Sequence, residues 1–359
     1  MKLLLGFFTP WIIYLIISLL HYLIPGKWVQ GYVTNKKTGV LLKYRLNGIW
    51  VLVSAFTIWF ILGFFNWVPY DWLYQVRWYS LAGAFSLGIL YTLKSVLPYP
   101  STGGSLFSDL YLGRLDNPQY ASGRIDAKMW LYLIGAVMLE LHVASFCSYH
   151  YTSFGYQASP GFLISALLLS YFILDYLTFE RVHLYTYDFF AEKVGFKLGW
   201  GCLVFYPYFY AIPLWATADL SGEASPQWIL WLSPIVFLTG WILARGANMQ
   251  KFYFKTQPTQ SFLGIQPETI TDGKRSLLIN GFWGISRHVN YLGEILMGSG
   301  IALAVSFYGS WLPWLYPLYY VALLFPRQLD DDKRCAAKYG DLWKRYTEKV
   351  KYKIIPYLY

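Results

Sequence analysis

Long apolar stretches recur along the whole chain and determine its predicted architecture. Seven of them are long and apolar enough, or nearly so, to cross a bilayer as helices, at residues 3–24, 49–68, 78–97, 129–148, 161–178, 228–244 and 311–325. A spanning helix needs about 20 mostly apolar residues to cover a hydrocarbon core of roughly 30 Å. Two further stretches are less regular, because prolines interrupt residues 198–218 and because residues 292–307 are short. The pattern predicts an all-α polytopic membrane protein with eight to ten transmembrane helices.

The first apolar stretch resembles a cleaved signal peptide only superficially. Lys2 precedes it, as a signal peptide requires, but its apolar part is too long. Pro25, Gly26 and Lys27 follow it in place of a small-x-small cleavage site. We therefore expect this stretch to remain in the protein as a transmembrane helix.

The composition supports a membrane location. Of the 359 residues, 56% are apolar and 13% are charged, which is about half the charge of an average soluble chain. Aromatic residues make up 21%, and their rings suit the two interfaces of a bilayer. This composition excludes a soluble domain, a disordered protein and a secreted disulfide scaffold. Cys147, Cys202 and Cys335 form no close pair in the sequence, so we expect neither a disulfide framework nor a metal site.

Basic residues are concentrated in two parts of the chain. The net charge is +10, but no basic stripe lies on a polar helix, so nucleic-acid binding is not predicted. The loop after the first stretch carries Lys27, Lys36, Lys37, Lys43 and Arg45 and no acid, which places it in the cytoplasm by the positive-inside rule. Fifteen of the 29 Lys and Arg residues lie at 245–287 and 327–353. We expect an anionic ligand to bind in this last third.

The sequence contains no Gly-x-Gly-x-x-Gly, no Walker loop, no His-Glu-x-x-His and no Gly-x-Ser-x-Gly motif. The usual soluble nucleotide-binding folds are therefore excluded, and a nucleotide would have to be held by side chains on helices. There is also no linker, low-complexity tract or repeat of fixed period. One continuous helical domain over residues 1–359 is the simplest organisation.

Three polar clusters in the last third are candidates for such a site. In the first, Asn248, Lys251 and Lys255 are spaced i, i+3 and i+7, so one helix face would carry all three. A cationic face of this kind can bind a phosphate. Lysines at a membrane interface, however, also extend their amines into water without any ligand. The sequence leaves both interpretations open.

The second cluster lies in residues 281–294, at the mouth of an apolar stretch. Its polar members crowd into eight residues and are Arg287, His288, Asn290, Tyr291 and Glu294. Burying so many polar groups is costly unless a ligand or a partner satisfies them. The alternative is a re-entrant turn with a purely structural role.

The third cluster lies in residues 323–346, directly after the last apolar stretch. Arg327 and Asp331 are spaced i, i+4 on a predicted helix, and Arg334 follows Asp331 by three residues. Arg327 can orient the carboxylate of Asp331, or the two can hold opposite ends of one cofactor. A solvated run of charges is the alternative.

Acidic residues also lie in the middle of the chain. Asp175, Glu180 and Asp188 flank the end of a predicted span, together with Arg181 and His183. Acids at a membrane boundary are rare and are candidates for function. A structural ion pair with Arg181 explains them equally well.

Several segments are similar to the signatures of the membrane sterol reductases, a family that includes the membrane part of the lamin B receptor. In chain order these segments are residues 43–48, 104–119, 175–207, 281–294 and 323–340. A few positions depart from the family pattern. Gln119 stands where the family usually has Arg, Glu294 where it has Asp, and Cys202 where it often has Asp.

The resemblance implies an enzyme that uses NADPH to reduce a carbon–carbon double bond of a membrane-dissolved sterol, at Δ7 or Δ14 or, as a further option, at Δ24(28). It implies about ten membrane helices, with residues 1–244 forming membrane helices and part of the sterol pocket and residues 245–359 binding NADPH. Carried over position by position, the implied cofactor contacts are Asn248, Lys251, Lys255, Trp283, Arg287, His288, Asn290, Tyr291, Arg327, Asp331, Tyr339 and Tyr346. Lys251 and Lys255 would favour NADPH over NADH through the extra phosphate.

The expected reaction needs an acid, a hydride donor and a dry pocket. Protonation of one alkene carbon gives a tertiary cation, and hydride from the nicotinamide then adds to the other carbon. A buried carboxyl has a raised pKa and can donate its proton near pH 7. The residues expected to act as the acid or as a proton relay are, first, Asp331 or Tyr346 and, second, Glu180, Asp188 or Tyr210.

Two other functions remain open at the level of the sequence. Isoprenylcysteine carboxyl methyltransferases have a similar Arg-His run and a similar charged exit helix, where they bind S-adenosylmethionine. A sterol-binding protein without catalysis is the other alternative. In each case we expect a multi-pass protein of a bacterial inner membrane or of an endoplasmic reticulum, with the cofactor site on the cytoplasmic side.

Overall fold

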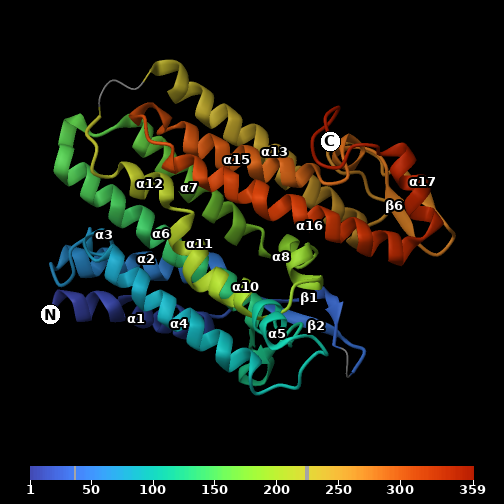
Figure 1. The fold of residues 1–359 in the computed structure, drawn as a ribbon, viewed down its shortest axis with the longest axis horizontal. Helices are drawn as coiled ribbons and strands as arrows, with labels where there is room; N and C mark the ends of the chain where they lie inside the picture. The colour runs from blue at the N-terminus through green and yellow to red at the C-terminus, as the bar shows by residue number, and fades with distance from the viewer. Residues whose placement is uncertain (36–37, 223–225) are drawn as a thin grey trace. The chain divides into compact units, whose positions relative to one another are not determined.

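The computed structural model describes residues 1–35, 38–222 and 226–359. Most of these residues are helical, as the sequence predicts (Figure 1). The chain divides into two compact units, Met1–Ala224 (unit 1) and Ser225–Tyr359 (unit 2). Lys36 and Lys37 of the predicted cytoplasmic loop lie outside the described residues.

The regular apolar stretches all form helices. Within the described ranges, four helices are long and apolar enough to cross a membrane: α1 (Lys2–Leu23), α6 (Ala127–Phe154), α7 (Pro160–Thr178) and α13 (Gln227–Thr256). Four more helices overlap predicted stretches: α2 (Gly48–Phe64), α4 (Arg77–Val96), α15 (Val289–Leu303) and α16 (Leu315–Tyr339). The protein thus has the helices of a membrane protein, and the total number of crossings stays a prediction.

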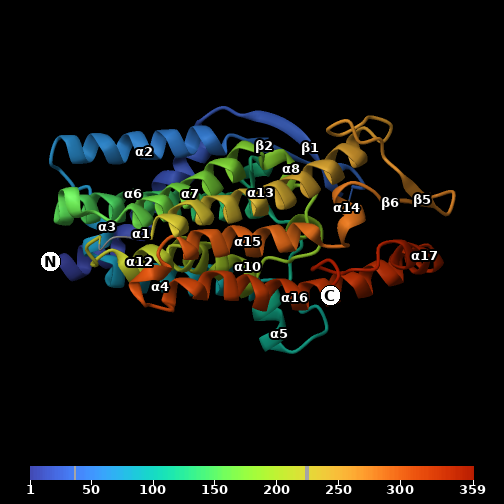
Figure 2. The same cartoon turned by 90° about the horizontal axis from the view of Figure 1, so that it is seen from above.

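α6 forms the core of unit 1. Most of the apolar window of α6 is buried, whereas less than half of the corresponding window is buried in α1 and in α7. Asp126 starts α6, because its Oδ1 accepts hydrogen bonds from the main-chain N–H groups of Lys128 and Met129 at 3.0 and 3.1 Å. In Figure 2, α2 lies along one side of this unit and α5 (Leu106–Leu112) projects from the other.

Shorter helices connect the long ones in unit 1. They are α3 (Trp72–Gln75), α8 (Glu180–His183), α9 (Tyr187–Phe190), α10 (Phe196–Trp200), α11 (Tyr206–Phe209) and α12 (Ile212–Thr217), with η1 (Ala121–Gly123), η2 (Gly155–Gln157) and the π-helical turn η3 (Gly201–Phe205). The predicted irregular stretch at 198–218 is therefore a series of short pieces.

Pro207 explains part of this interruption. Proline has no N–H, so in an α-helix the carbonyl four residues earlier loses its partner. That carbonyl belongs to Leu203, and the hydroxyl of Tyr14 in α1 donates a hydrogen bond to it instead. The break in the helix is thus compensated by a side chain from a distant part of the sequence.

Three small antiparallel sheets correct the all-α prediction. Each has two strands: β1 (Lys27–Thr34) with β2 (Leu41–Leu46), β3 (Gln119–Tyr120) with β4 (Ile125–Asp126), and β5 (Thr269–Thr271) with β6 (Ser276–Leu278). The first pair begins with Lys27 opposite Leu46 and places Val29 in a cluster with Tyr44 and Phe189. A search for long apolar stretches does not detect strands this short.

Glycines allow the helices of unit 2 to pack closely. A Cβ atom on Gly293 of α15 would lie 2.5 Å from the carbonyl oxygen of Gly240 in α13, so only glycine fits there. Figure 1 shows α13, α15 and α16 side by side, with α17 (Asp341–Lys349) at one end of them. The remaining elements of unit 2 are α14 (Phe282–Ile285), η4 (Ser306–Tyr308) and η5 (Leu312–Trp314).

Candidate functional site

The last turns of α13 meet the second predicted cluster. Asn248 and Lys251 lie on this helix, as their spacing predicts. The Oδ1 atom of Asn248 accepts a hydrogen bond from Nδ2 of Asn290 at 3.4 Å. The Nζ atom of Lys251 lies 5.6 Å from the ring centre of Trp283. Lys255, one turn later, is exposed.

Gln250 and Gly281 shape the turn before α15. The N–H of Phe282 donates to Oε1 of Gln250 at 3.0 Å, and Nε1 of Trp283 donates to the carbonyl of Ala247 at 2.8 Å. Gly281 has a φ of +62°, and a Cβ there would lie 2.3 Å from Nε2 of Gln250. Glycine is therefore required by the backbone and by the space available. The turn is tied to α13 at two points.

Arg287 and His288 are held by a segment late in the chain. The N–H of Arg287 donates to the carbonyl of Tyr352 at 2.9 Å, and the N–H of His288 donates to the carbonyl of Lys353 at 2.8 Å. Nη1 of Arg287 donates to the carbonyl of Val350 at 3.2 Å. Both side chains are buried. The backbone thus positions the two polar residues before any ligand contributes.

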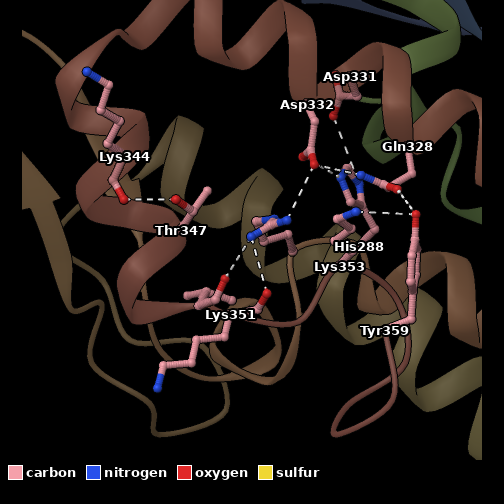
Figure 3. A network of polar contacts seen from close by, with 11 residues as sticks. His288, Gln328, Asp331, Asp332, Lys344, Thr347, Lys351, Lys353 and Tyr359 are labelled. Atoms are coloured by element: carbon pink, nitrogen blue, oxygen red, sulfur yellow. Dashed lines mark hydrogen bonds and ion pairs between the residues drawn. The ribbon is translucent and has the colours of Figure 1, made fainter.

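Asp331 and Asp332 are consecutive on α16, and both carboxylates lie beside His288. Oδ2 of Asp332 accepts hydrogen bonds from Nε2 of Gln328 at 2.6 Å and from Nη2 of Arg287 at 3.4 Å. Oδ2 of Asp331 lies 4.0 Å from Nδ1 of His288, and Oδ1 of Asp332 lies 3.6 Å from its Nε2. Figure 3 shows the imidazole of His288 with contacts to both carboxylates.

Asp332 is kept ionised by its surroundings. It lies beyond the apolar part of α16. Burial alone would raise the pKa of Asp332, but the neighbouring His288, Arg287 and Lys353 together hold the pKa below its ordinary value. The carboxylate is therefore charged at neutral pH and attracts the guanidinium of Arg287.

Further predicted residues surround Asp331. The ring of Tyr346 in α17 stacks on Trp343 with centres 5.0 Å apart, and burial raises the pKa of the Tyr346 hydroxyl. Tyr346 and Lys251 both interact electrostatically with Asp331. Arg327 lies one turn before Asp331 on the same helix face. These groups converge at one end of unit 2.

Two aromatic residues complete this region. The ring of Tyr291 stacks on the imidazole of His288 with centres 4.9 Å apart. Tyr339 lies farther out. Its ring centre is 5.4 Å from the guanidinium of Arg275 and 6.5 Å from the ring centre of Trp343. Arg334, expected near Asp331, forms an ion pair of 3.8 Å with Asp330.

The second-choice acids lie in unit 1. Oε2 of Glu180 accepts a hydrogen bond from the N–H of Gly48 at 3.1 Å, and burial raises the pKa of this carboxyl to about 7. The main-chain carbonyl of Asp188 accepts from Nζ of Lys128 at 2.9 Å. The ring of Tyr210 packs against Tyr206 with centres 4.7 Å apart.

The groups gathered in unit 2 fit a phosphorylated dinucleotide. Lys251, Arg287 and Arg327 supply cationic donors for phosphates, and the aromatic rings can stack on a base or on a nicotinamide. Nε of Arg287, Oδ1 of Asn290 and Oδ1 of Asp332 are buried and have no hydrogen-bond partner among the described residues. Such atoms favour a polar ligand, because leaving them unsatisfied is costly.

Sequence reasoning missed Gln328 and Asp332. Gln328 continues a buried stripe on α16 that begins with Tyr316, Tyr320 and Leu324 at a spacing of four residues, and the partly buried Asp332 follows at the same spacing. Following that spacing beyond the apolar stretch would have identified them. The contributions of Gln250 and Tyr359 have no comparable sequence signal, because their partners are distant in the chain.

Comparison with known proteins gives a consistent result along the whole chain. The model of the ergosterol biosynthesis ERG4/ERG24 family matches residues 4–359. The chain is similar to the Delta(14)-sterol reductase of Arabidopsis thaliana, with 30% identity over 351 residues that cover 94% of this chain and 91% of the relative.

Two other relatives show the same level of identity. The Delta(14)-sterol reductase of Methylotuvimicrobium alcaliphilum is 30% identical over 353 residues, which cover 93% of this chain and 79% of the relative. The 7-dehydrocholesterol reductase of Danio rerio is 30% identical over 366 residues, which cover 95% and 75%.

Proposed function

We propose that this chain, which belongs to the ergosterol biosynthesis ERG4/ERG24 family, reduces a carbon–carbon double bond of a sterol with NADPH. The observation that carries the proposal is the combination of a family match from residue 4 to residue 359 with the buried polar cluster at the end of α13, α15 and α16. The match supports the reaction class, and the cluster supports a site for the cofactor.

NADPH would be held by the residues that the sequence singled out. They are Asn248, Lys251, Lys255, Trp283, Arg287, His288, Asn290, Tyr291, Arg327, Asp331, Tyr339 and Tyr346. The cationic members would bind phosphates, and the aromatic members would stack on the flat rings. When bound, this cofactor supplies the hydride.

The protein must supply the proton and exclude water. Asp331 and Tyr346 are the first candidates, because they lie together in the cluster and because Tyr346 is buried. Glu180, with a pKa of about 7, retains a proton on about half of the molecules at neutral pH, and Asp188 and Tyr210 complete the second set. Apolar helices around such an acid keep the site dry.

The membrane arrangement follows from the same reasoning. We propose about ten transmembrane helices in a single sterol-reductase domain, with residues 1–244 containing part of the sterol pocket and residues 245–359 binding the cofactor. The basic residues of the last third support a cofactor site on the cytoplasmic side. A sterol dissolved in the bilayer would enter laterally, in a bacterial inner membrane or an endoplasmic reticulum.

We expect the reduced bond to be Δ14 or Δ7, with Δ24(28) as a further option, since relatives named for each of the first two reactions are 30% identical to this chain. Purified protein should be incubated with NADPH and, separately, with a Δ14, a Δ7 and a Δ24(28) sterol, and the products analysed by mass spectrometry. A mass gain of two hydrogens with one substrate identifies the reaction. No gain with any of the three refutes the proposal.

A binding measurement separates the competing functions. Thermal unfolding should be followed with NADPH and with S-adenosylmethionine in parallel, because a ligand that binds the folded state raises the melting temperature. A rise with NADPH alone supports the reductase. A rise with S-adenosylmethionine alone supports a methyltransferase, and binding of sterol without either supports a non-catalytic sterol-binding protein.

A further inference from the structure

The buried stripe of α16 changes from apolar to polar where the helix reaches the candidate site. Up to Leu324 its residues are aromatic or aliphatic, and the buried Gln328 and the partly buried Asp332 follow at the same spacing. Gln328 is fully buried, with none of its surface exposed. A buried amide needs partners for both its oxygen and its nitrogen, and its two ends cannot be exchanged without exchanging the partners.

A chain of hydrogen bonds runs from Tyr359 to the site through this amide. The hydroxyl of Tyr359 donates to Oε1 of Gln328 at 3.2 Å, and Nε2 of Gln328 donates to Oδ2 of Asp332 at 2.6 Å. The same carboxylate accepts from Arg287 and lies beside His288. Figure 3 shows Tyr359, Gln328, Asp332 and His288 in this order.

The position of Tyr359 is itself well defined. Its ring stacks on Phe325 with centres 5.3 Å apart, and its carbonyl oxygen accepts from the N–H groups of Lys353 and Ile354 at 2.8 and 3.1 Å. Nζ of Lys353 donates to the Tyr359 hydroxyl oxygen at 3.4 Å. Because the Tyr359 oxygen accepts a hydrogen bond from Lys353, its own proton is free to point toward Oε1 of Gln328.

We propose that Tyr359, Gln328 and Asp332 are positioning residues of the cofactor site. Asp332 holds Arg287 and His288 in place, Gln328 donates to Asp332, and Tyr359 holds the oxygen end of the Gln328 amide. The two consecutive aspartates then have separate roles, with Asp331 directed to the ligand and Asp332 directed to the protein. The inference rests on the proposed function, which supplies the ligand.

The hydroxyl of Tyr359 has a specific effect in this arrangement. Without it, the buried Oε1 atom of Gln328 loses its donor, while Nε2 still donates to Asp332. A buried oxygen without a donor is costly, so the Gln328 side chain would shift to recover one and would hold Asp332 less firmly against Arg287 and His288. NADPH binding would weaken although no residue in contact with NADPH has changed.

The first experiment measures the dissociation constant of NADPH by quenching of tryptophan fluorescence, with the full chain in detergent. Tyr359→Phe removes one neutral hydrogen bond and is expected to raise the dissociation constant about two- to tenfold. Asp332→Asn removes a charged one and is expected to raise it about tenfold or more. The matched control is Tyr357→Phe, because Tyr357 is 89% exposed and should bind NADPH like the wild type.

A double-mutant cycle then tests whether the residues act through one another. Adding Tyr359→Phe to Asp332→Asn should weaken binding no further, whereas adding it to Lys251→Met should multiply the two effects. Melting temperatures without NADPH are measured for every variant. Tyr359→Phe leaves a buried oxygen without its donor and should lower the melting temperature modestly while the protein stays folded.

The possible results separate the two proposals. A wild-type protein that binds no NADPH overturns the proposed function and this inference with it. Normal NADPH binding by Tyr359→Phe overturns the inference and leaves the function intact. A lowered melting temperature with an unchanged dissociation constant shows a purely structural role and also overturns it. Weaker binding by a variant that remains folded, with the expected cycle, supports it.

Discussion

Glu180 offers a test of the electrostatics of unit 1 that does not depend on catalysis. Glu180 is the first residue of α8 and follows the end of α7 closely. Its carboxyl accepts a hydrogen bond from the N–H of Gly48. Burial raises its pKa from an ordinary value of 4.5 to about 7. We change it to Gln, which keeps the shape and a carbonyl oxygen for Gly48 but carries no ionisable proton.

The magnitude follows from proton linkage. The folded protein holds the proton more tightly than the unfolded chain, so the stability contributed by protonation is fully present below pH 4.5 and is lost as the pH rises through about 7. Each pKa unit is worth about 1.4 kcal/mol, so the loss between pH 5 and pH 9 is about 3 kcal/mol. Glu180→Gln is free of this loss.

The assay is thermal unfolding in detergent at intervals from pH 5 to pH 9, followed by intrinsic fluorescence. The difference in melting temperature between Glu180→Gln and the wild type should be near zero at pH 5 and should favour the variant increasingly up to pH 9. Glu348→Gln is the control, because Glu348 is exposed and its loss should give no trend with pH. A difference that stays constant with pH, or that favours the wild type at pH 9, would refute the reasoning.

Three further perturbations test other parts of the structure. Gly293→Ala in α15 should lower the free energy of unfolding by about 1–3 kcal/mol, and the melting temperature with it, because the new Cβ would lie 2.5 Å from the carbonyl oxygen of Gly240. Lys251→Glu should abolish NADPH binding, measured by tryptophan quenching, while the protein still unfolds cooperatively as a folded chain does. Tyr14→Phe should lower the unfolding free energy by about 1–3 kcal/mol in thermal unfolding, because the carbonyl of Leu203 loses its donor.

Each of these perturbations has a matched control. Gly201→Ala adds a methyl group where no atom lies within 4 Å and should be neutral. Lys349→Glu, the control for Lys251→Glu, reverses an exposed charge on α17. Tyr151→Phe, the control for Tyr14→Phe, removes an exposed hydroxyl. Equal effects of a variant and its control would contradict the structural explanation, and so would NADPH binding by Lys251→Glu at wild-type affinity.

Much of the helical framework could be predicted from the sequence, because long apolar stretches have few alternatives to a helix. The interruption at Pro207 was also predictable, since proline removes a donor. The rescue of the Leu203 carbonyl by Tyr14 was not, because it joins residues far apart in the chain. The hairpin at residues 27–46 was missed for a different reason, namely that its strands are too short for a search based on spans.

The candidate site shows the same division. Local spacing correctly placed Lys251 on a helix and Arg327 on the same face as Asp331. The spacing could not show that Asp332, and not Asp331, accepts from Arg287, because that contact depends on how α16 is rotated against the turn before α15. Contacts of this kind are set by tertiary packing and not by the local pattern.

The rotation of α16 has a consequence for how the chain tolerates changes in length. Inserting or deleting one residue between Tyr320 and Arg327 would turn the polar end of the helix by about 100° relative to its aromatic beginning. Asp331 and Asp332 would then no longer meet their present neighbours, although every side chain would still be there. Among related chains, we expect helices such as α16 to differ by substitutions that keep their length. Insertions and deletions are expected in the exposed turns between helices.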